Sequence, residues 1–314
     1  MNFFHSLCTD IGIHRKSNQD SIGLFKASTD LGEVLFALVC DGMGGYENGE
    51  LASRILIETF ETWFKSEFPY SIYDRHFSYE GLFKQWGRLI YDCNEKLVRY
   101  GMNHGISLGS TLTAVLLVEN EYFMAHVGDS RAFVITADKV YQMTRDQSVV
   151  AEAVRRGEIT PEQAKKDRRR NMLLECIGVT PDIYPLFYKG KYRERDTFLL
   201  CSDGFWHNLT DDELIRYLDG RQFNENMELY MQLKYLIELD KSRGEKDNLS
   251  AVAIVPYRKR TDSETVELFV SQSPPASGVK NGEAMTKTIG GRFYIMTDEK
   301  EVRESADGSS LTDI

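Results

Sequence analysis

The alternation of apolar and polar stretches divides the chain into a series of expected strands and helices. The run Val34–Cys40 is almost continuously apolar and rich in strand-forming residues, which predicts a strand buried on both faces. We expect this strand to end at Asp41, because the following segment, residues 42–45, holds three glycines. Apolar residues recur with helical spacing from Leu51 to Phe64, which predicts an amphipathic helix directly afterwards.

Similar patterns continue as far as residue 255. Two short strand-like runs between residues 6 and 26 flank a polar loop at 13–20, and a second amphipathic helix is expected from Tyr79 to Tyr100. Trp63 and Trp86 are the expected core contacts between the two long helices. Short β-branched or aromatic runs predict strands at residues 111–118, 122–127, 131–136, 140–143, 183–188, 197–201 and 249–255, and helical spacing predicts helices at 211–218 and 226–239.

The order of these elements is not a regular alternation of strand and helix. It favours an α+β fold, an antiparallel β-sandwich flanked by helices on both outer faces, giving α-β-β-α layers. We therefore expect one domain over residues 1–257. From residue 258 to 314 Ser, Thr, Pro, Gly and mixed charges dominate, with only weak strand-like patches at 266–270 and 293–296. This composition predicts a flexible C-terminal extension.

Composition and charge narrow the function classes. The 314-residue chain has a net charge of -10 and a pI near 5.2, which argues against nucleic acid as the main partner. No apolar stretch approaches the ~20 residues of a membrane span, and the N-terminus lacks a secretory pattern. Five cysteines without paired spacing suggest a reducing environment. We expect a monomer in the cytoplasm that does not associate with a membrane.

Four aspartates share one sequence context. Each lies beside a Gly or Asn at the end or start of an apolar run: Asp41, Asp129, Asp203 and Asp247. Strand ends meet at the rim of a sandwich, where clustered carboxylates stay ionised only if cations lie among them. Oxygen ligands favour Mg²⁺ or Mn²⁺ over zinc. The alternative is four independent turn aspartates.

Six short motifs then occur in a fixed order: R-K-S-N-Q-D (15–20), D-G-M-G-G (41–45), G-S-T-L (109–112), H-V-G-D-S-R (126–131), C-S-D-G-F-W (201–206) and D-N-L-S (247–250). Together they resemble the metal-dependent serine/threonine protein phosphatases of type 2C, especially the bacterial branch. The resemblance spans residues 5–256. It implies a β-sandwich with a two-metal site at one edge and hydrolysis of phosphoserine and phosphothreonine on proteins.

The resemblance also implies roles for individual residues. Metal-holding roles fall on Asp20 (through water), Asp41 (bridging both ions), the Gly42 carbonyl, Asp203, Asp247 and, with Asp203 at an additional third site, Asp129. Arg15 matches the position that binds the substrate phosphate, and its planar fork suits a phosphate bidentately. Two Mn²⁺ or Mg²⁺ ions would generate a bridging hydroxide that attacks phosphorus. Asp41 and Arg15 are thus the expected catalytic residues.

Two positions depart from the family pattern. Some members carry a histidine, a candidate general acid, where this chain has Met43, so no side-chain acid is assigned. A histidine is also common where Gln147 stands. Residues 146–178 resemble the family's flap beside the active site, and we expect this flap to shape substrate choice.

The expected partners are phosphorylated proteins and a cognate serine/threonine kinase that the enzyme opposes in a bacterial cytoplasm. One alternative is a pseudophosphatase that binds phosphoproteins without turnover, although the intact aspartates argue against it. Another alternative is an active phosphatase whose substrate is an anti-sigma-factor antagonist. In the tail, Thr286 and Thr288 lie in a basic context, and we hypothesise that one of them is phosphorylated and recruits a phosphothreonine-binding partner or is a self-substrate.

Overall fold

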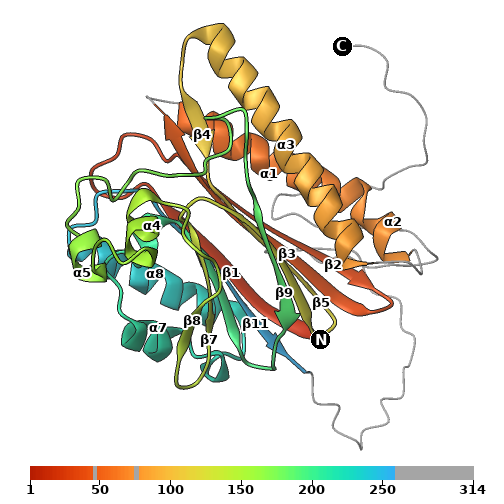
Figure 1. Ribbon diagram of the computed structural model, residues 1–314. Coiled ribbons are helices and arrows are strands. Elements are labelled where there is room, and N and C mark those ends of the chain that lie inside the picture. Colours follow the sequence, from red (N-terminus) through yellow and green to blue (C-terminus); the bar gives the residue numbers. More distant parts are fainter. Residues whose placement is uncertain (45–47, 74–77, 259–314) are drawn as a thin grey trace, which may run out of the picture.

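Two antiparallel β-sheets pack face to face in the computed structural model, which describes residues 1–44, 48–73 and 78–258 (Figure 1). Sheet A consists, in spatial order, of β1 (Asn2–Asp10), β11 (Leu249–Tyr257), β10 (Thr197–Cys201), β7 (Arg131–Ile135) and β8 (Val140–Gln142). Sheet B consists of β2 (Asp20–Thr29), β3 (Gly32–Gly44), β5 (Leu112–Val118), β6 (Glu121–Val127) and β9 (Leu186–Lys191), with β4 (Leu108–Ser110) paired to the end of β3.

Helices cover the outer face of each sheet. Sheet B carries α1 (Asn48–Ser66), α2 (Phe68–Tyr73) and α3 (Tyr79–His104). Sheet A carries α6 (Asp203–Trp206), α7 (Asp211–Leu218), the short 3₁₀ helix η1 (Gly220–Gln222) and α8 (Asn226–Ser242), while α4 (Val149–Arg155) and α5 (Pro161–Ala164) belong to the flap. The expected α+β sandwich with helices on both outer faces is therefore confirmed (Figure 1).

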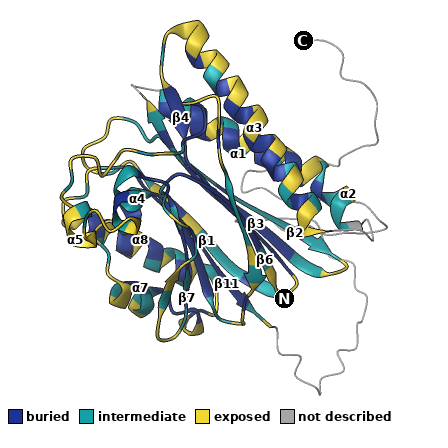
Figure 2. Cartoon of the chain, viewed as in Figure 1, coloured by how far each residue is buried: buried dark blue, intermediate teal, exposed yellow. Residues whose placement is uncertain are grey.

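The strand β3 shows why the layers form. Its even-numbered residues, such as Phe36 and Leu38, are fully buried against the helices of sheet B. Its odd-numbered residues, such as Leu35 and Val39, are fully buried between the two sheets. Side chains alternate across a strand, so a strand between two apolar layers needs a continuous apolar run. Figure 2 shows the dark, buried strands at the centre of the molecule.

The two long helices pack as their sequence pattern predicts. The Trp63 and Trp86 rings meet edge to face with centroids 5.6 Å apart, and both side chains are buried. The helix α3 begins after Ser78, whose Oγ accepts the Gly81 N–H, and ends at Gly105 with φ of 65°. It therefore runs one turn beyond the expected end.

Some expected boundaries are wrong. The strand β3 does not end at Asp41 but continues to Gly44, because the backbone of β4 pairs with this glycine segment. The strand expected at 183–188 lies at 186–191, since this edge strand pairs with β6 through its polar half. The short helix α2 and the strand β4 were not expected from the sequence.

The C-terminal extension expected for residues 258–314 lies outside the described residues apart from Arg258, and so do its strand-like patches and both threonines. Within the described part of the chain, no helix combines the length and apolar character needed to cross a bilayer. The five cysteines are buried free thiols.

Candidate active site

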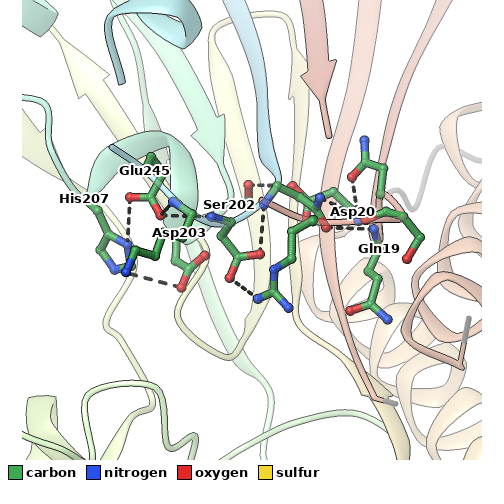
Figure 3. A network of polar contacts seen from close by, with 12 residues as sticks. Gln19, Asp20, Ser202, Asp203, His207 and Glu245 are labelled. Carbon is green, nitrogen blue, oxygen red and sulfur yellow. Dashed lines mark hydrogen bonds and ion pairs between the residues drawn. The ribbon is translucent and has the colours of Figure 1, made fainter. Parts of the chain in front are cut away.

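The first two carboxylates of the candidate site lie on neighbouring strands. The register of β2 and β3 places Asp20 directly opposite Asp41. Asp20 is 8 % exposed, and its Oδ2 accepts a hydrogen bond of 2.8 Å from the Ser202 hydroxyl (Figure 3). Since Ser202 follows β10, this bond joins the rims of the two sheets.

The backbone around Asp41 is held on both sides. The Asp41 N–H donates to Thr111 Oγ1, and the Asp41 carbonyl accepts from the Thr111 N–H, both at 2.9 Å. The Gly42 N–H donates to the Gln19 carbonyl at 3.1 Å. A Cβ atom on Gly42 would lie 2.1 Å from the Gly49 carbonyl oxygen, so only glycine fits here. The backbone at Asp41 and Gly42 is therefore held in place, and the start of α1 lies immediately beside it.

The other three expected carboxylates also lie at strand ends. Asp129 follows β6 after Gly128, whose φ is 106°, while Asp203 begins α6 after β10 and Asp247 precedes β11. The Asp203 Oδ1 is buried and has no hydrogen-bond partner among the described residues. A buried carboxylate oxygen without a hydrogen bond needs a positively charged group or a hydrogen-bond donor to compensate its negative charge.

The electrostatics show that these carboxylates share one neighbourhood. Burial raises the pKa of Asp41, and the charges of Asp20, Asp203, Asp129 and Asp247 raise it further. Burial and neighbouring carboxylates likewise raise the pKa of Asp20 to about 7 and of Asp129 to about 8. The pKa of Asp203 is raised mainly by burial. The rim therefore has an excess of negative charge, on the buried Asp20 and on the half-buried Asp41, Asp129 and Asp203.

A hard divalent cation fits this rim. Carboxylate and carbonyl oxygens are its preferred ligands, and its charge would compensate the buried carboxylates and the unpaired Asp203 oxygen. Within the described residues, no three His, Cys, Asp or Glu side chains converge closely enough on one point to form a complete metal site. The aspartates gather at one rim without forming a closed set of side-chain ligands, so the Gly42 carbonyl and water would have to supply further ligands to an ion held there.

Arg15 reaches the same rim from the loop between β1 and β2. Its Nη2 lies 2.5 Å from Asp247 Oδ2, and this hydrogen bond raises the pKa of Arg15. The Arg15 side chain is 47 % exposed, so the guanidinium faces both the carboxylates and solvent. It is placed where an incoming anion would meet the cluster.

A group of hydrogen bonds centred on Glu245, called the Glu245 bracket below, was not expected from the sequence (Figure 3). The Glu245 Oε1 accepts from the backbone N–H of Lys246 and of Asp247, at 2.7 and 3.1 Å, and its Oε2 accepts from the Asn208 amide at 2.8 Å. His207 lies between Glu245 and Asp203, at 3.7 and 3.9 Å from their oxygens. The sequence does hold a signal for these two residues, because His207 lies four residues after Asp203 and Glu245 lies two residues before Asp247.

Asn248 fixes the loop that carries Arg15. Its Oδ1 accepts from the Gln19 N–H at 2.9 Å, and its amide donates to the carbonyls of Ile11 and Ser17 at 2.9 and 3.1 Å. Asn248 is 3 % exposed. The Asn of the D-N-L-S motif thus has a positioning role that the motif itself did not reveal.

The two departures from the family pattern have clear local consequences. Gln147 forms two hydrogen bonds with Gly128, the residue before Asp129. Its side-chain Oε1 accepts the Gly128 N–H at 2.9 Å, and its backbone N–H donates to the Gly128 carbonyl at 2.8 Å. Its side-chain amide donates to Tyr184 at 2.9 Å, so Gln147 anchors the flap. Met43 has no ionisable proton and supplies no acid.

Comparison with known proteins identifies the family. The model of the protein phosphatase 2C family matches residues 13–234. A putative protein phosphatase 2C-type from Streptococcus pyogenes is 31% identical over 263 residues, covering 83% of this chain and 99% of that protein. The crystal structure of the serine/threonine phosphatase Stp1 from Staphylococcus aureus is similar with a TM-score of 0.71 and 28% identity, covering 82% of this chain and 96% of that one.

A second solved structure adds information on metals. The catalytic domain of the serine/threonine protein phosphatase PstP, solved in complex with two manganese ions, is similar with a TM-score of 0.66 and 26% identity, covering 82% of this chain and 99% of that one. The family match spans most of the sandwich and every carboxylate of the rim except Asp247. This chain belongs to the protein phosphatase 2C family and is a protein-serine/threonine phosphatase.

Proposed function

We propose that this phosphatase works with two Mn²⁺ or Mg²⁺ ions held by Asp20, Asp41, Asp203, Asp247 and the Gly42 carbonyl, with a third ion at Asp129 and Asp203. The observation that carries the proposal is the gathering of buried and half-buried carboxylates at one rim, where the Asp203 Oδ1 has no partner among the described residues. Two manganese ions in the similar PstP domain support it.

The bound ions would supply a hydroxide nucleophile at neutral pH by lowering the pKa of a water that they share. The chain's own residues position the reaction. The two hydrogen bonds to Thr111 fix the Asp41 backbone, and the Arg15 guanidinium exchanges its Asp247 partner for the phosphate oxygens of the substrate. No side chain is assigned as the acid for the leaving alkoxide, because Met43 has no ionisable proton, and water at the metal site would have to supply this proton.

Hydrolysis of p-nitrophenyl phosphate and of a phosphothreonine peptide tests this function. We expect turnover with Mn²⁺, none with EDTA, and a loss of at least about 100-fold in kcat for Asp203→Ala. Asp92→Ala, which removes an exposed carboxylate from α3, is the matched control and should retain activity. Turnover that survives EDTA would contradict a metal-centred reaction, and peptide binding without turnover would indicate a pseudophosphatase.

We further propose that the enzyme acts as a cytoplasmic monomer on phosphoserine and phosphothreonine placed by a cognate kinase. Its family membership supports phosphoprotein substrates. The tail hypothesis also remains a proposal: Thr286 or Thr288 is phosphorylated and recruits a phosphothreonine-binding partner. Mass spectrometry of protein co-expressed with the kinase would refute it by finding both threonines unmodified.

A further inference from the structure

The flap contains a strongly basic stretch in an otherwise acidic chain. Residues 155–170 carry seven basic and three acidic side chains, whereas the whole chain has a net charge of -10. The rest of the chain is therefore even more acidic than the total suggests. An acidic ligand would be repelled by most of this molecule and attracted at the flap.

Ion pairs neutralise only part of this charge. Arg155 and Arg156 both pair with Glu152, and Arg169 pairs with Asp167 at 2.8 Å. The other four cations are Lys165, Lys166, Arg168 and Arg170. No carboxylate of residues 1–44, 48–73 and 78–258 lies within 4.0 Å of their charged nitrogens. All four residues are exposed to solvent.

The backbone ties this basic stretch to the active site. The Val149 N–H donates to the Met172 carbonyl at 2.8 Å, two residues after Arg170, and Gln147 is bonded to Gly128 beside Asp129. The far end of the flap bonds Ser110 through Ile177, and Ser110 pairs with Gly42. Both ends of the flap are thus fastened to the strands that carry the site carboxylates.

We propose that Lys165, Lys166, Arg168 and Arg170 form a docking surface for acidic residues that flank the phosphorylated residue of a protein substrate. We call these four side chains the basic flap segment. The inference rests on the proposed phosphatase function and adds a substrate class to it. Because both ends of the flap are fastened beside the site carboxylates, a substrate chain at the rim would lie next to the flap, where unpaired cations would contact Asp or Glu side chains. The pairing would be electrostatic and therefore sensitive to salt.

Two phosphothreonine peptides test the proposal, one with Asp and Glu around the phosphothreonine and one with Gln and Ala. We measure kcat/KM for each with Mn²⁺, and the ratio of the two values cancels any change in the chemistry itself. We expect a preference of about ten-fold for the acidic peptide at low ionic strength, expressed mainly in KM. The preference should be lost at 0.5 M salt, where the Debye length is only about 4 Å.

Variants assign the preference to the basic flap segment. Replacing its four cations with alanine should remove the preference, and replacing them with glutamate should reverse it toward a peptide flanked by lysine. The matched control removes four cations from the outer helices, Arg54, Lys84, Arg88 and Lys96, and should keep the preference. An equal ratio in wild type and flap variant would overturn the proposal.

The two proposals fail in different ways. Hydrolysis of p-nitrophenyl phosphate without a preference between the peptides would refute the docking surface and leave the phosphatase function intact. If no substrate is hydrolysed, fluorescence anisotropy with the same two peptides still measures the preference as binding. Tighter binding of a single-stranded oligonucleotide or of anionic vesicles than of the acidic peptide would also overturn the proposal.

Discussion

Glu245 shows how a single side chain can organise a site that it does not belong to. Its two oxygens accept hydrogen bonds from the backbone beside Asp247 and from Asn208, which follows α6, the helix that begins with Asp203. His207 and the backbone N–H groups of Lys246 and Asp247 lower the pKa of Glu245 to about 2 despite its burial. Residues behind metal ligands commonly set ligand orientation.

Removing the charge of Glu245 should weaken metal binding. Glu245→Gln keeps the size of the side chain but replaces one accepting oxygen with an amide group. We expect about ten-fold weaker Mn²⁺ binding by calorimetry, with the fold retained. Glu121→Gln, at an exposed position in β6, is the matched control. Unchanged affinity in Glu245→Gln would show that the Glu245 bracket does not position the ligands.

Asp240 on α8 is a second residue with a measurable signature. Its side chain is fully buried, and neither carboxylate oxygen has a hydrogen-bond partner among the described residues. Burial and the charge of Glu245 raise the pKa of Asp240 to about 7. The folded state therefore favours the protonated form. Its contribution to stability is complete below pH 4 and is lost as the pH rises to about 7.

The Asp240→Asn variant should reveal this dependence. At pH 8 the wild type buries a charge that the variant lacks, so we expect the variant to be more stable by ~1–2 kcal/mol. At pH 5 the wild-type carboxyl is mostly neutral, and the difference should be small. Urea denaturation at the two pH values measures the free energy of unfolding. A difference that does not change with pH would contradict the assignment.

At the scale of whole elements, one helix residue fastens the flap to the sandwich. Asn94 in α3 is 1 % exposed. Its Oδ1 accepts from the Gly178 N–H at 2.7 Å, and its amide donates to the carbonyls of Thr180 and Pro181 at 2.9 and 3.0 Å. Three backbone groups of a segment without regular structure thus depend on one side chain.

Asn94→Ala should therefore be costly. It leaves buried backbone groups without partners, so we expect a loss of about 2–3 kcal/mol in the free energy of unfolding, measured by urea denaturation. The exposed Asn103 lies on the same helix, and Asn103→Ala should change stability by less than about 0.5 kcal/mol. Similar losses in both variants would indicate a helix effect instead of a flap anchor.

The sequence predicts local structure better than contacts between distant segments. Local patterns predicted the buried core of β3 and both long helices, and they indicated a shared site for Asp41, Asp129, Asp203 and Asp247. Asp20 and Arg15 were assigned only through the family resemblance. Local patterns failed where a distant segment decides the outcome: β4 extends β3, and β6 sets the register of β9. The partners Ser202 for Asp20 and Asn248 for Gln19 are 182 and 229 residues away, which no local pattern encodes.

For the molecule as a whole, the candidate metal site lies across the junction of two sheets. Asp20 and Asp41 come from sheet B, while Asp203 and Asp247 come from sheet A. A cation among them would bind the folded sandwich and not the unfolded chain. Metal binding should therefore stabilise the fold as a unit.

Thermal unfolding checks this coupling. Mn²⁺ at about 100 times its Kd should add ~2.7 kcal/mol of stability and raise the Tm by several degrees. Asp41→Asn should lose most of this increase. The Asp92→Ala variant is again the control and should keep it. A Tm that does not respond to Mn²⁺ in the wild type would contradict binding at this junction.

The pairing of β1 with β11, the last strand of the described residues, has a consequence for protein synthesis. Asn2 in β1 pairs with Tyr257 in β11, and Arg15 meets Asp247 across 232 residues. A nascent chain cannot close sheet A until β11 has left the ribosome, and contacts this distant in sequence form slowly. We therefore expect no activity from a chain that stops before residue 247, because it would lack both Asp247 and the strand β11 that completes sheet A.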